Sequence, residues 1–131
     1  MAQSVTVFIV EGSPSVRECL ADLISEEGPA RIIGYADKAA DAMREIVAQH
    51  PDVTLVDISL RDGSGVDLLA SIKRRCPATT AVVLSNEAQP PMRSRCRHRG
   101  VDHFFDVTID IGEVVALLRR LAQRGAGGAT G

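Results

Sequence analysis

The sequence predicts an α/β fold in which a parallel sheet of five strands lies between two layers of helices. Strand-like and helix-like patterns alternate five times along the 131-residue chain. The first, third and fourth strand-like segments are nearly continuous aliphatic runs, as expected for strands that helices cover on both faces. The connections are short, which favours right-handed crossovers and therefore a parallel sheet.

Five segments carry the strand pattern. The second, ARIIGYA, is shorter and more polar at its ends, which suits a position nearer the edge of the sheet. We predict strands at Val5–Val10, Arg31–Tyr35, Val53–Val56, Thr80–Leu84 and Asp102–Phe105.

A helix follows the first strand. Ser13 is placed to cap it, and Pro14 fits the first helical position, where a missing N–H is harmless. Gly28 and Pro29 end this helix. One buried stripe of apolar residues is predicted along it, at Val16, Cys19, Leu20, Leu23 and Ile24.

Prolines close the next two helices. The second spans Ala39 to Gln49, and Pro51 follows it. The third carries an apolar stripe from Leu68 to Cys76, and Pro77 ends it.

The fourth and fifth helices differ in apolar content. In AQPPMRSRCRHRG only Met92 and Cys96 form an apolar stripe, so the fourth helix is expected to pack shallowly. A capping box, Asp110-x-x-Glu113, opens the fifth, which is rich in leucine and valine. From residue 124 the chain reads RGAGGATG, so we predict one domain over residues 1–123 and a disordered tail over residues 124–131.

Composition and charge exclude several classes of function. The net charge is −2, which gives no sign of binding nucleic acid or a membrane through bulk charge. No run of about 18 apolar residues could span a bilayer, and the N-terminus lacks the basic region of a signal peptide. The three cysteines have no Cys-x-x-Cys spacing, which suggests reduced thiols. We therefore expect a cytoplasmic domain that binds neither nucleic acid nor a membrane.

Polar side chains stand where three of the strands end. Glu11 follows the first strand, Asp57 follows the third, and Ser85 follows the fourth. Because the carboxyl ends of parallel strands meet at the edge where ligands bind, these residues are expected to share one pocket. Two neighbouring carboxylates suit a divalent cation with oxygen ligands, or a carboxylate nucleophile that accepts a phosphoryl group.

Four short motifs carry a family resemblance. FIVEG holds the acidic end of the first strand, and LVDISLRDGSG holds the third strand and its loop. VVLSN holds the hydroxyl of the fourth strand, and RGVDHFFD holds the fifth strand with its aromatic residue. Together they resemble the receiver domain of bacterial two-component response regulators, from about Val5 to Leu121. The resemblance implies a receiver domain over residues 1–123 with the flavodoxin-like strand order 2-1-3-4-5.

The resemblance also implies a signalling role and roles for single residues. A histidine kinase or a phosphotransfer protein donates a phosphoryl group to an aspartate in that family, and that aspartate is Asp57 here. The family's metal would be held by Glu11, Asp57 and the main-chain carbonyl of Ser59. The family's hydroxyl falls on Ser85 and its aromatic switch residue on Phe104. Output to another protein, or pairing with a second copy, would use the face of the fourth helix, fifth strand and last helix.

Three positions depart from the family pattern. The family normally has two adjacent acids after the first strand, whereas the chain has Glu11 and Gly12, so the direct metal ligand is missing. Val107 stands where the family has a lysine after the fifth strand, and Arg61 replaces a proline in the loop after the phosphoacceptor. We therefore expect Mg²⁺ to bind weakly or not at all, and phosphorylation of Asp57 to be slow or absent.

Plainer interpretations of these residues stay open. Asp57 could cap its loop, Glu11 could be a surface acid that the first helix dipole favours, and Ser85 and Phe104 could be structural. A metal site made of Cys96, His98 and His103 is not favoured. Cys96 and His98 lie two residues apart on the predicted helix, so their side chains point in different directions. Four arginines alternate along the fourth helix, at Arg93, Arg95, Arg97 and Arg99. We favour a solvated helix face there over a basic patch that contacts an acidic partner.

Two rival functions differ in class from a phosphorylated receiver. A pseudo-receiver would bind proteins without phosphorylation, and Gly12 and Val107 favour it. An aspartate-nucleophile phosphatase needs a second acid two residues after the nucleophile, where the chain has Ser59. We therefore expect a signalling module and not an enzyme.

Overall fold

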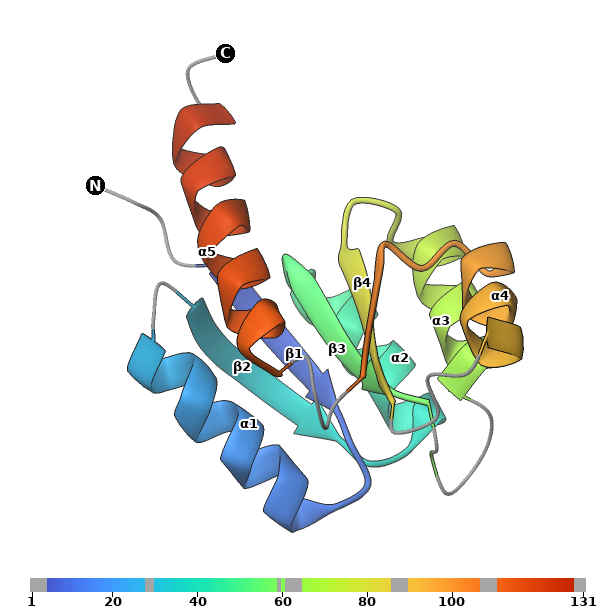
Figure 1. Cartoon of the computed structure of the whole chain (residues 1–131). Helices are drawn as coiled ribbons and strands as arrows, with labels where there is room; N and C mark the ends of the chain where they lie inside the picture. The colour runs from blue at the N-terminus through green and yellow to red at the C-terminus, as the bar shows by residue number, and fades with distance from the viewer. Residues whose placement is uncertain are drawn as a thin grey trace.

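A parallel sheet of five strands forms the centre of the molecule, and its order β2-β1-β3-β4-β5 confirms the predicted flavodoxin-like fold (Figure 1). The structure, a computed structural model, describes residues 5–27, 30–58, 60, 65–85, 90–106 and 111–128. Neighbouring strands pair in parallel throughout. The strands are β1 (Val5–Val10), β2 (Ala30–Ala36), β3 (Val53–Asp57), β4 (Thr80–Ser85) and β5 (His103–Asp106).

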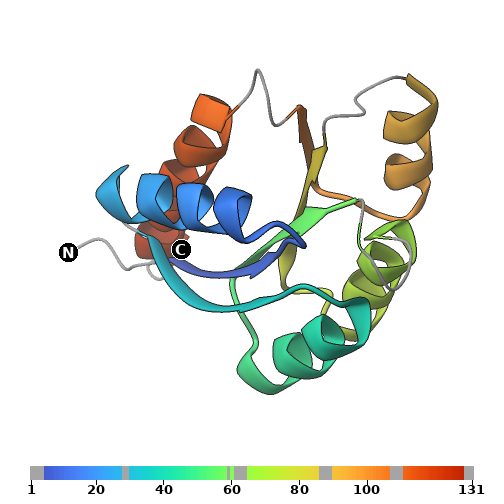
Figure 2. The ribbon, with the colours of Figure 1, turned by 90° about the horizontal axis from the view of Figure 1, so that it is seen from below.

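Helices cover both faces of this sheet. They are α1 (Pro14–Glu27), α2 (Ala39–Gln49), α3 (Gly65–Arg75), α4 (Pro90–His98) and α5 (Ile111–Gly128). Figure 2 shows α1 and α5 on one side of the sheet and α2 and α3 on the other, with α4 near the β5 edge. The predicted arrangement of three layers is therefore confirmed.

Strand β1 shows why the aliphatic runs are continuous. Val7 and Ile9 pack into the cluster that includes residues of α1 and α5. Phe8 and Val10 pack into the cluster that includes residues of α2 and α3. Successive side chains of a strand point to opposite faces, so a strand covered on both faces is apolar at every position.

Several bounds differ from those that the sequence predicts. Strands β3 and β4 each extend by one residue, so Asp57 and Ser85 are the last residues of their strands. Strand β5 begins at His103, one residue later than predicted. Asp102 instead turns its carboxylate back to accept hydrogen bonds from Lys73 Nζ and the Ala81 N–H.

Helix α5 is longer than the sequence predicts. It continues to Gly128, past residue 124, where the sequence predicts that a disordered tail begins. No proline lies between residues 111 and 128, so no ring blocks the backbone hydrogen bonds, although glycine is a poor helix former. This helix therefore extends into the predicted tail, and the division into a domain over residues 1–123 and a tail over residues 124–131 stays a prediction.

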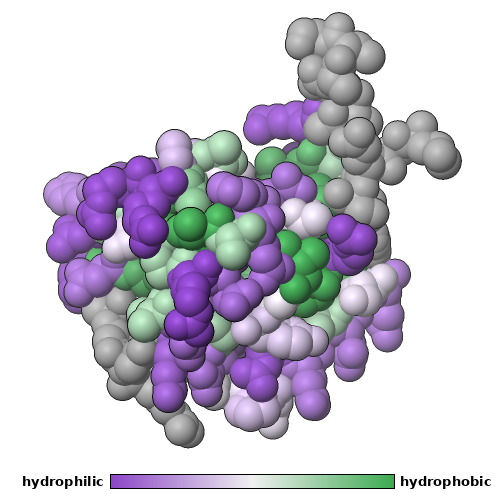
Figure 3. Space-filling view, turned by 180° about the vertical axis from the view of Figure 1, so that it is seen from behind, coloured by the Kyte–Doolittle hydropathy of each residue, from purple (hydrophilic) through white to green (hydrophobic). Residues whose placement is uncertain are grey.

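The side of the molecule opposite to the view of Figure 1 is mostly hydrophilic, with hydrophobic residues in small separate patches (Figure 3). Among the described residues, Tyr35 is the one large hydrophobic side chain that is exposed, at 53%. Within those same ranges, no helix combines the length and the apolar content needed to cross a bilayer.

Candidate functional site

Glu11, Asp57 and Ser85 lie at neighbouring positions on the carboxyl edge of the sheet. Glu11 follows Val10 and Asp57 follows Val56, and these two valines are partners across β1 and β3. The partner of Asp57 across β3 and β4 is the residue just before Ser85. The structure therefore brings together the three strand-end residues that the sequence predicts to share a pocket.

These residues differ in how far solvent reaches them. Glu11 is 7% exposed and Ser85 is 2% exposed, whereas Asp57 is half-buried. Of the two carboxyl groups, Asp57 is therefore the one that a ligand in solution can approach.

The start of α1 holds Glu11 in place. The Ser13 backbone N–H donates a hydrogen bond to Glu11 Oε1 at 3.1 Å. Arg17 Nη1 donates to the main-chain oxygen of Glu11 at 3.4 Å. Ser13 Oγ also accepts a hydrogen bond from the Val16 N–H at 3.4 Å, which confirms its predicted capping role. The capped turn thus aims backbone N–H groups at the Glu11 carboxyl group.

Burial, the largest cause, raises the pKa of Glu11 from its ordinary 4.5 to about 7. The negative charge of Asp57 and a hydrogen bond between the two side chains act in the same direction. The hydrogen bonds from the backbone of Ser13 and Gly12 oppose them and lower this pKa. Near neutral pH a proton on Glu11 therefore stabilises the pair, and a bound cation could take its place.

Two glycines beside the site have opposite surroundings. A Cβ at Gly12 would meet no atom within 4 Å, so this position has room for a side chain. A Cβ at Gly65 would lie 2.7 Å from the Asp57 main-chain oxygen and 2.7 Å from the Ile58 Cα. The Gly65 N–H also donates a hydrogen bond to the Ile58 oxygen at 3.2 Å. Gly65 therefore lets the start of α3 approach the backbone that carries Asp57.

The described donors suit a hard divalent cation. The Glu11 and Asp57 carboxyl groups are neighbours, and Mg²⁺ in proteins is typically bound by one or two carboxylates with water completing its shell. Ser59, Arg61 and Val107 lie outside the described residues. In the part of the chain that the structure describes, no three His, Cys, Asp or Glu side chains form a metal cluster, at the fourth helix or elsewhere.

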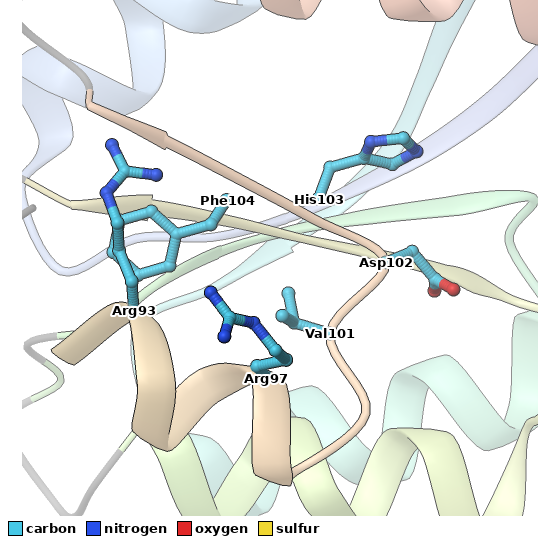
Figure 4. A pocket seen from close by; sticks show the side chains of 6 residues that line it. All are labelled: Arg93, Arg97, Val101, Asp102, His103 and Phe104. Carbon is cyan, nitrogen blue, oxygen red and sulfur yellow. The ribbon is translucent and has the colours of Figure 1, made fainter. Parts of the chain in front are cut away.

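Phe104 lies on β5, opposite Val83 of β4. Its half-buried ring packs against the core cluster that includes Cys96 of α4. The guanidinium carbon of Arg93 lies 4.6 Å from the ring centroid, in a cation–π contact (Figure 4). The predicted switch residue therefore sits between the sheet and α4, while its role stays a prediction.

Sequence reasoning did not find the positioning role of Gly65 or Arg17, nor the contact between Arg93 and Phe104. The role of Gly65 depends on how closely two backbone segments approach, and a lone glycine after a loop is a weak signal of that. Arg17 contacts the main chain of Glu11 across the turn before α1, and Arg93 of α4 contacts Phe104 of β5. No local periodicity of the sequence encodes them.

Comparison with known proteins connects these features to a single family. Residues 7–119 match the response regulator receiver domain family. The chain is 33% identical over 82 residues to the DNA-binding transcriptional activator DevR/DosR of Mycobacterium tuberculosis. This match covers 63% of the chain and 38% of that protein. It is 29% identical over 94 residues to a protein-glutamate methylesterase/protein-glutamine glutaminase of Syntrophus aciditrophicus, covering 69% of this chain and 27% of that enzyme. The chain thus spans well under half the length of both relatives.

A solved structure shares the fold. The signal receiver domain of NarL from Mycobacterium tuberculosis is 24% identical and superposes with a TM-score of 0.84. The match covers 92% of this chain and 98% of that one. At this identity the likeness concerns the fold alone.

Proposed function

Because the chain belongs to the response regulator receiver domain family, we propose that it accepts a phosphoryl group on Asp57 from a histidine kinase or a phosphotransfer protein. The position of Asp57 carries this proposal. It is the last residue of β3, half-buried, and beside Glu11 at the carboxyl edge of the sheet. Ligands of open α/β sheets bind at this edge. The role implies a cytoplasmic location.

The proposed reaction moves a phosphoryl group from one side chain to another. A carboxylate oxygen of Asp57 attacks the phosphorus of a phosphohistidine. The bond from phosphorus to the imidazole nitrogen breaks as the new oxygen–phosphorus bond forms, and its electron pair stays with the imidazole. Glu11 is too buried, at 7% exposure, to compete as the acceptor.

Glu11 and Asp57 are the described residues that would hold Mg²⁺, with the main-chain carbonyl of Ser59 as the third ligand that the family implies. A bound cation neutralises charge on the transferring oxygens. Glu11 would bind it in its ionised form, so cation binding would release the proton that Glu11 holds near neutral pH.

We expect this transfer to be slower than in receivers with two acids after the first strand. Gly12 supplies no carboxylate, although it has room for one. At Val107 the chain lacks the lysine that pairs with the phosphoryl group in the family. Fewer charges around the transferring oxygens mean weaker stabilisation of the transition state.

The single acid after β1, where the family has two, also supports a second function, that of a pseudo-receiver that binds proteins without phosphorylation. In that case the hydrogen bond between Glu11 and Asp57 would serve only to join the ends of β1 and β3. Neither function makes the chain an enzyme. The methylesterase relative is matched over 27% of its length, in its receiver domain.

The proposed output surface is the face of α4, β5 and α5, where an output protein or a second copy of the chain would bind. Ser85 and Phe104 are proposed to connect Asp57 to it. Ser85 pairs with Asp106 of β5, and Phe104 lies two residues before Asp106 on the same strand. Adjacent strand positions therefore lead from the carboxyl edge of β3 to the side of α4.

Incubation with Mg²⁺ and acetyl phosphate, followed by intact-mass measurement, tests the proposed phosphorylation. Asp57→Asn removes the nucleophile with little change in shape. Asp67→Asn, at an exposed position on α3, is the matched control. The wild type and Asp67→Asn are expected to gain one phosphoryl group, and Asp57→Asn none. Identical unmodified spectra for all three proteins would support the pseudo-receiver instead.

A further inference from the structure

We propose that a pocket between α4 and β5 binds an acidic segment of a partner protein. A carboxylate of that segment would pair with Arg93 and Arg97, and an adjoining apolar side chain would lie on Val101 and Phe104. This inference rests on the proposed output through the α4–β5–α5 face, and it names the chemistry of the partner.

The pocket has room for a few side chains and no more. Its volume is about 370 Å³, at the small end of the range for ligand sites. Figure 4 shows Arg93 and Arg97 reaching from α4 into the space beside β5, with Phe104 next to Arg93 and Val101 next to Arg97. A cationic rim over an apolar floor suits an extended segment that alternates carboxylate and apolar groups.

The acidic residue that lines the pocket is already engaged elsewhere. Figure 4 shows the carboxylate of Asp102 turned away from the arginines. Its Oδ2 accepts hydrogen bonds from Lys73 Nζ and from the Ala81 N–H, both at 2.8 Å. Arg97 is exposed, and no carboxylate of the described residues forms an ion pair with it. A guanidinium group in this situation is suited to bind a carboxylate through two hydrogen bonds.

Arg93 is held above the Phe104 ring, with 4.6 Å between its guanidinium carbon and the ring centroid. This contact already restricts the arginine side chain, so less conformational entropy is lost when a carboxylate binds.

The α5 side of β5 is basic as well. Burial lowers the pKa of His103, Asp102 opposes this effect, and the positive charges of Arg120 and Arg124 add to it. A second copy docked on this face about a twofold axis would bring the basic groups of α4 and α5 against their own kind. Charge therefore favours an acidic partner over a second copy.

An NMR titration with a synthetic peptide tests this proposal. The probe is the acetylated and amidated hexapeptide Glu-Leu-Glu-Glu-Leu-Glu, and the control peptide has lysine in place of every glutamate. The acidic peptide is expected to shift the amide signals of Val101 and Phe104 and the Nε signal of Arg97. The lysine peptide is expected to leave them unchanged. Shifts with both peptides, or with neither, would overturn the proposal.

Two charge reversals on α4 locate the binding site. Arg97→Glu and Arg95→Glu change the net charge equally at exposed positions of one helix, but only Arg97 lines the pocket. Arg97→Glu is expected to weaken binding of the acidic peptide at least about tenfold, and Arg95→Glu less than about twofold. Equal weakening by both changes would mean general attraction to a basic helix and would contradict a defined pocket.

The other occupants and the proposed function are tested separately. A dimer in sedimentation velocity that Arg97→Glu dissociates would assign the pocket to a second copy. Tighter binding of oligothymidylate than of the acidic peptide would assign it to nucleic acid. Either result overturns the proposal.

The mass assay on Asp57 is independent of peptide binding. If Asp57 is modified but the peptide does not bind, only the pocket assignment fails. If the peptide binds but Asp57 is not modified, only the phosphoacceptor role fails.

Discussion

The carboxyl groups of Glu11 and Asp57 are neighbours at the carboxyl ends of the adjacent strands β1 and β3, and the negative charge of Asp57 adds to burial in favouring the protonated form of Glu11. Because Glu11 is the more deeply buried, we assign the proton to Glu11. Proton binding and cation binding therefore compete for this pair of side chains, which includes the proposed phosphoacceptor Asp57.

Ionisation of Glu11 is expected to destabilise the protein as the pH rises. Its pKa is raised from 4.5 to about 7, so the folded state holds this proton more tightly than the unfolded state. The stabilisation is complete below the lower value and is lost as the pH rises through the higher one, a loss on the order of 3 kcal/mol. Glu11→Gln removes this loss, so at about pH 8 without Mg²⁺ we expect it to unfold at higher urea concentration than the wild type.

Glu18→Gln, at an exposed position on α1, is the control for this experiment. It is expected to follow the wild type at every pH. If the free energy of unfolding of Glu11→Gln declines with pH as steeply as that of the wild type, then Glu11 does not hold the proton.

Mg²⁺ is expected to stabilise the wild type above neutral pH by replacing the proton of the pair. With one acid where the family has two, the site binds weakly, and we expect a rise in Tm of about 2–4 °C in roughly 10 mM MgCl₂. Asp57→Asn is expected to lose this rise, and Asp67→Asn is expected to keep it. Calorimetry against NaCl of equal ionic strength measures the effect, and an equal Tm in both salts would argue against a cation site.

Gly12→Asp is expected to restore a missing carboxylate at little structural cost. A Cβ at this position meets no atom within 4 Å, so the new side chain fits without displacing a neighbour. We expect modification of Asp57 by acetyl phosphate to become about tenfold faster, equivalent to about 1.4 kcal/mol at the transition state. Gly112→Asp adds the same charge at another open position and is expected to change the rate little. No gain over Gly112→Asp would contradict the proposed alignment of the site.

Gly65→Ala is expected to disturb the backbone that carries Asp57. The added methyl group would lie 2.7 Å from the Asp57 main-chain oxygen, and backbone has little freedom to move aside. We expect a loss of about 1–3 kcal/mol in the free energy of unfolding and slower modification of Asp57. Gly12→Ala, which adds the same group in open space, is expected to leave both nearly unchanged. Equal stability of the two variants in urea would show that α3 adjusts freely.

Strand positions were predictable where burial on both faces leaves a continuous apolar run. Strands β1, β3 and β4 are such runs, and each ends close to where the sequence predicts. The predicted start of β5 and the predicted end of α5 differ more from the structure. Asp102 leaves the strand because its carboxylate binds groups distant in sequence, and α5 continues because no proline stops it.

The sequence predicts which residues lie at the candidate site, because they end neighbouring strands, but it does not predict the interactions between them. The topology alone brings Glu11, Asp57 and Ser85 to one edge once the strand order is known. The proton on Glu11 depends on burial and on the distance to Asp57, which the sequence does not contain. The close approach of Gly65 to Asp57 likewise arises only when α3 packs in place.

Identification of the modified residue tests the phosphoacceptor role of Asp57 most directly. The protein is treated with acetyl phosphate and Mg²⁺, reduced with borohydride to convert an aspartyl phosphate into homoserine, digested, and sequenced by tandem mass spectrometry. We expect homoserine at Asp57, at a higher yield in Gly12→Asp, and at no other aspartate. Homoserine at another aspartate, or none at any position even in Gly12→Asp, would contradict the assignment of Asp57 as the phosphoacceptor.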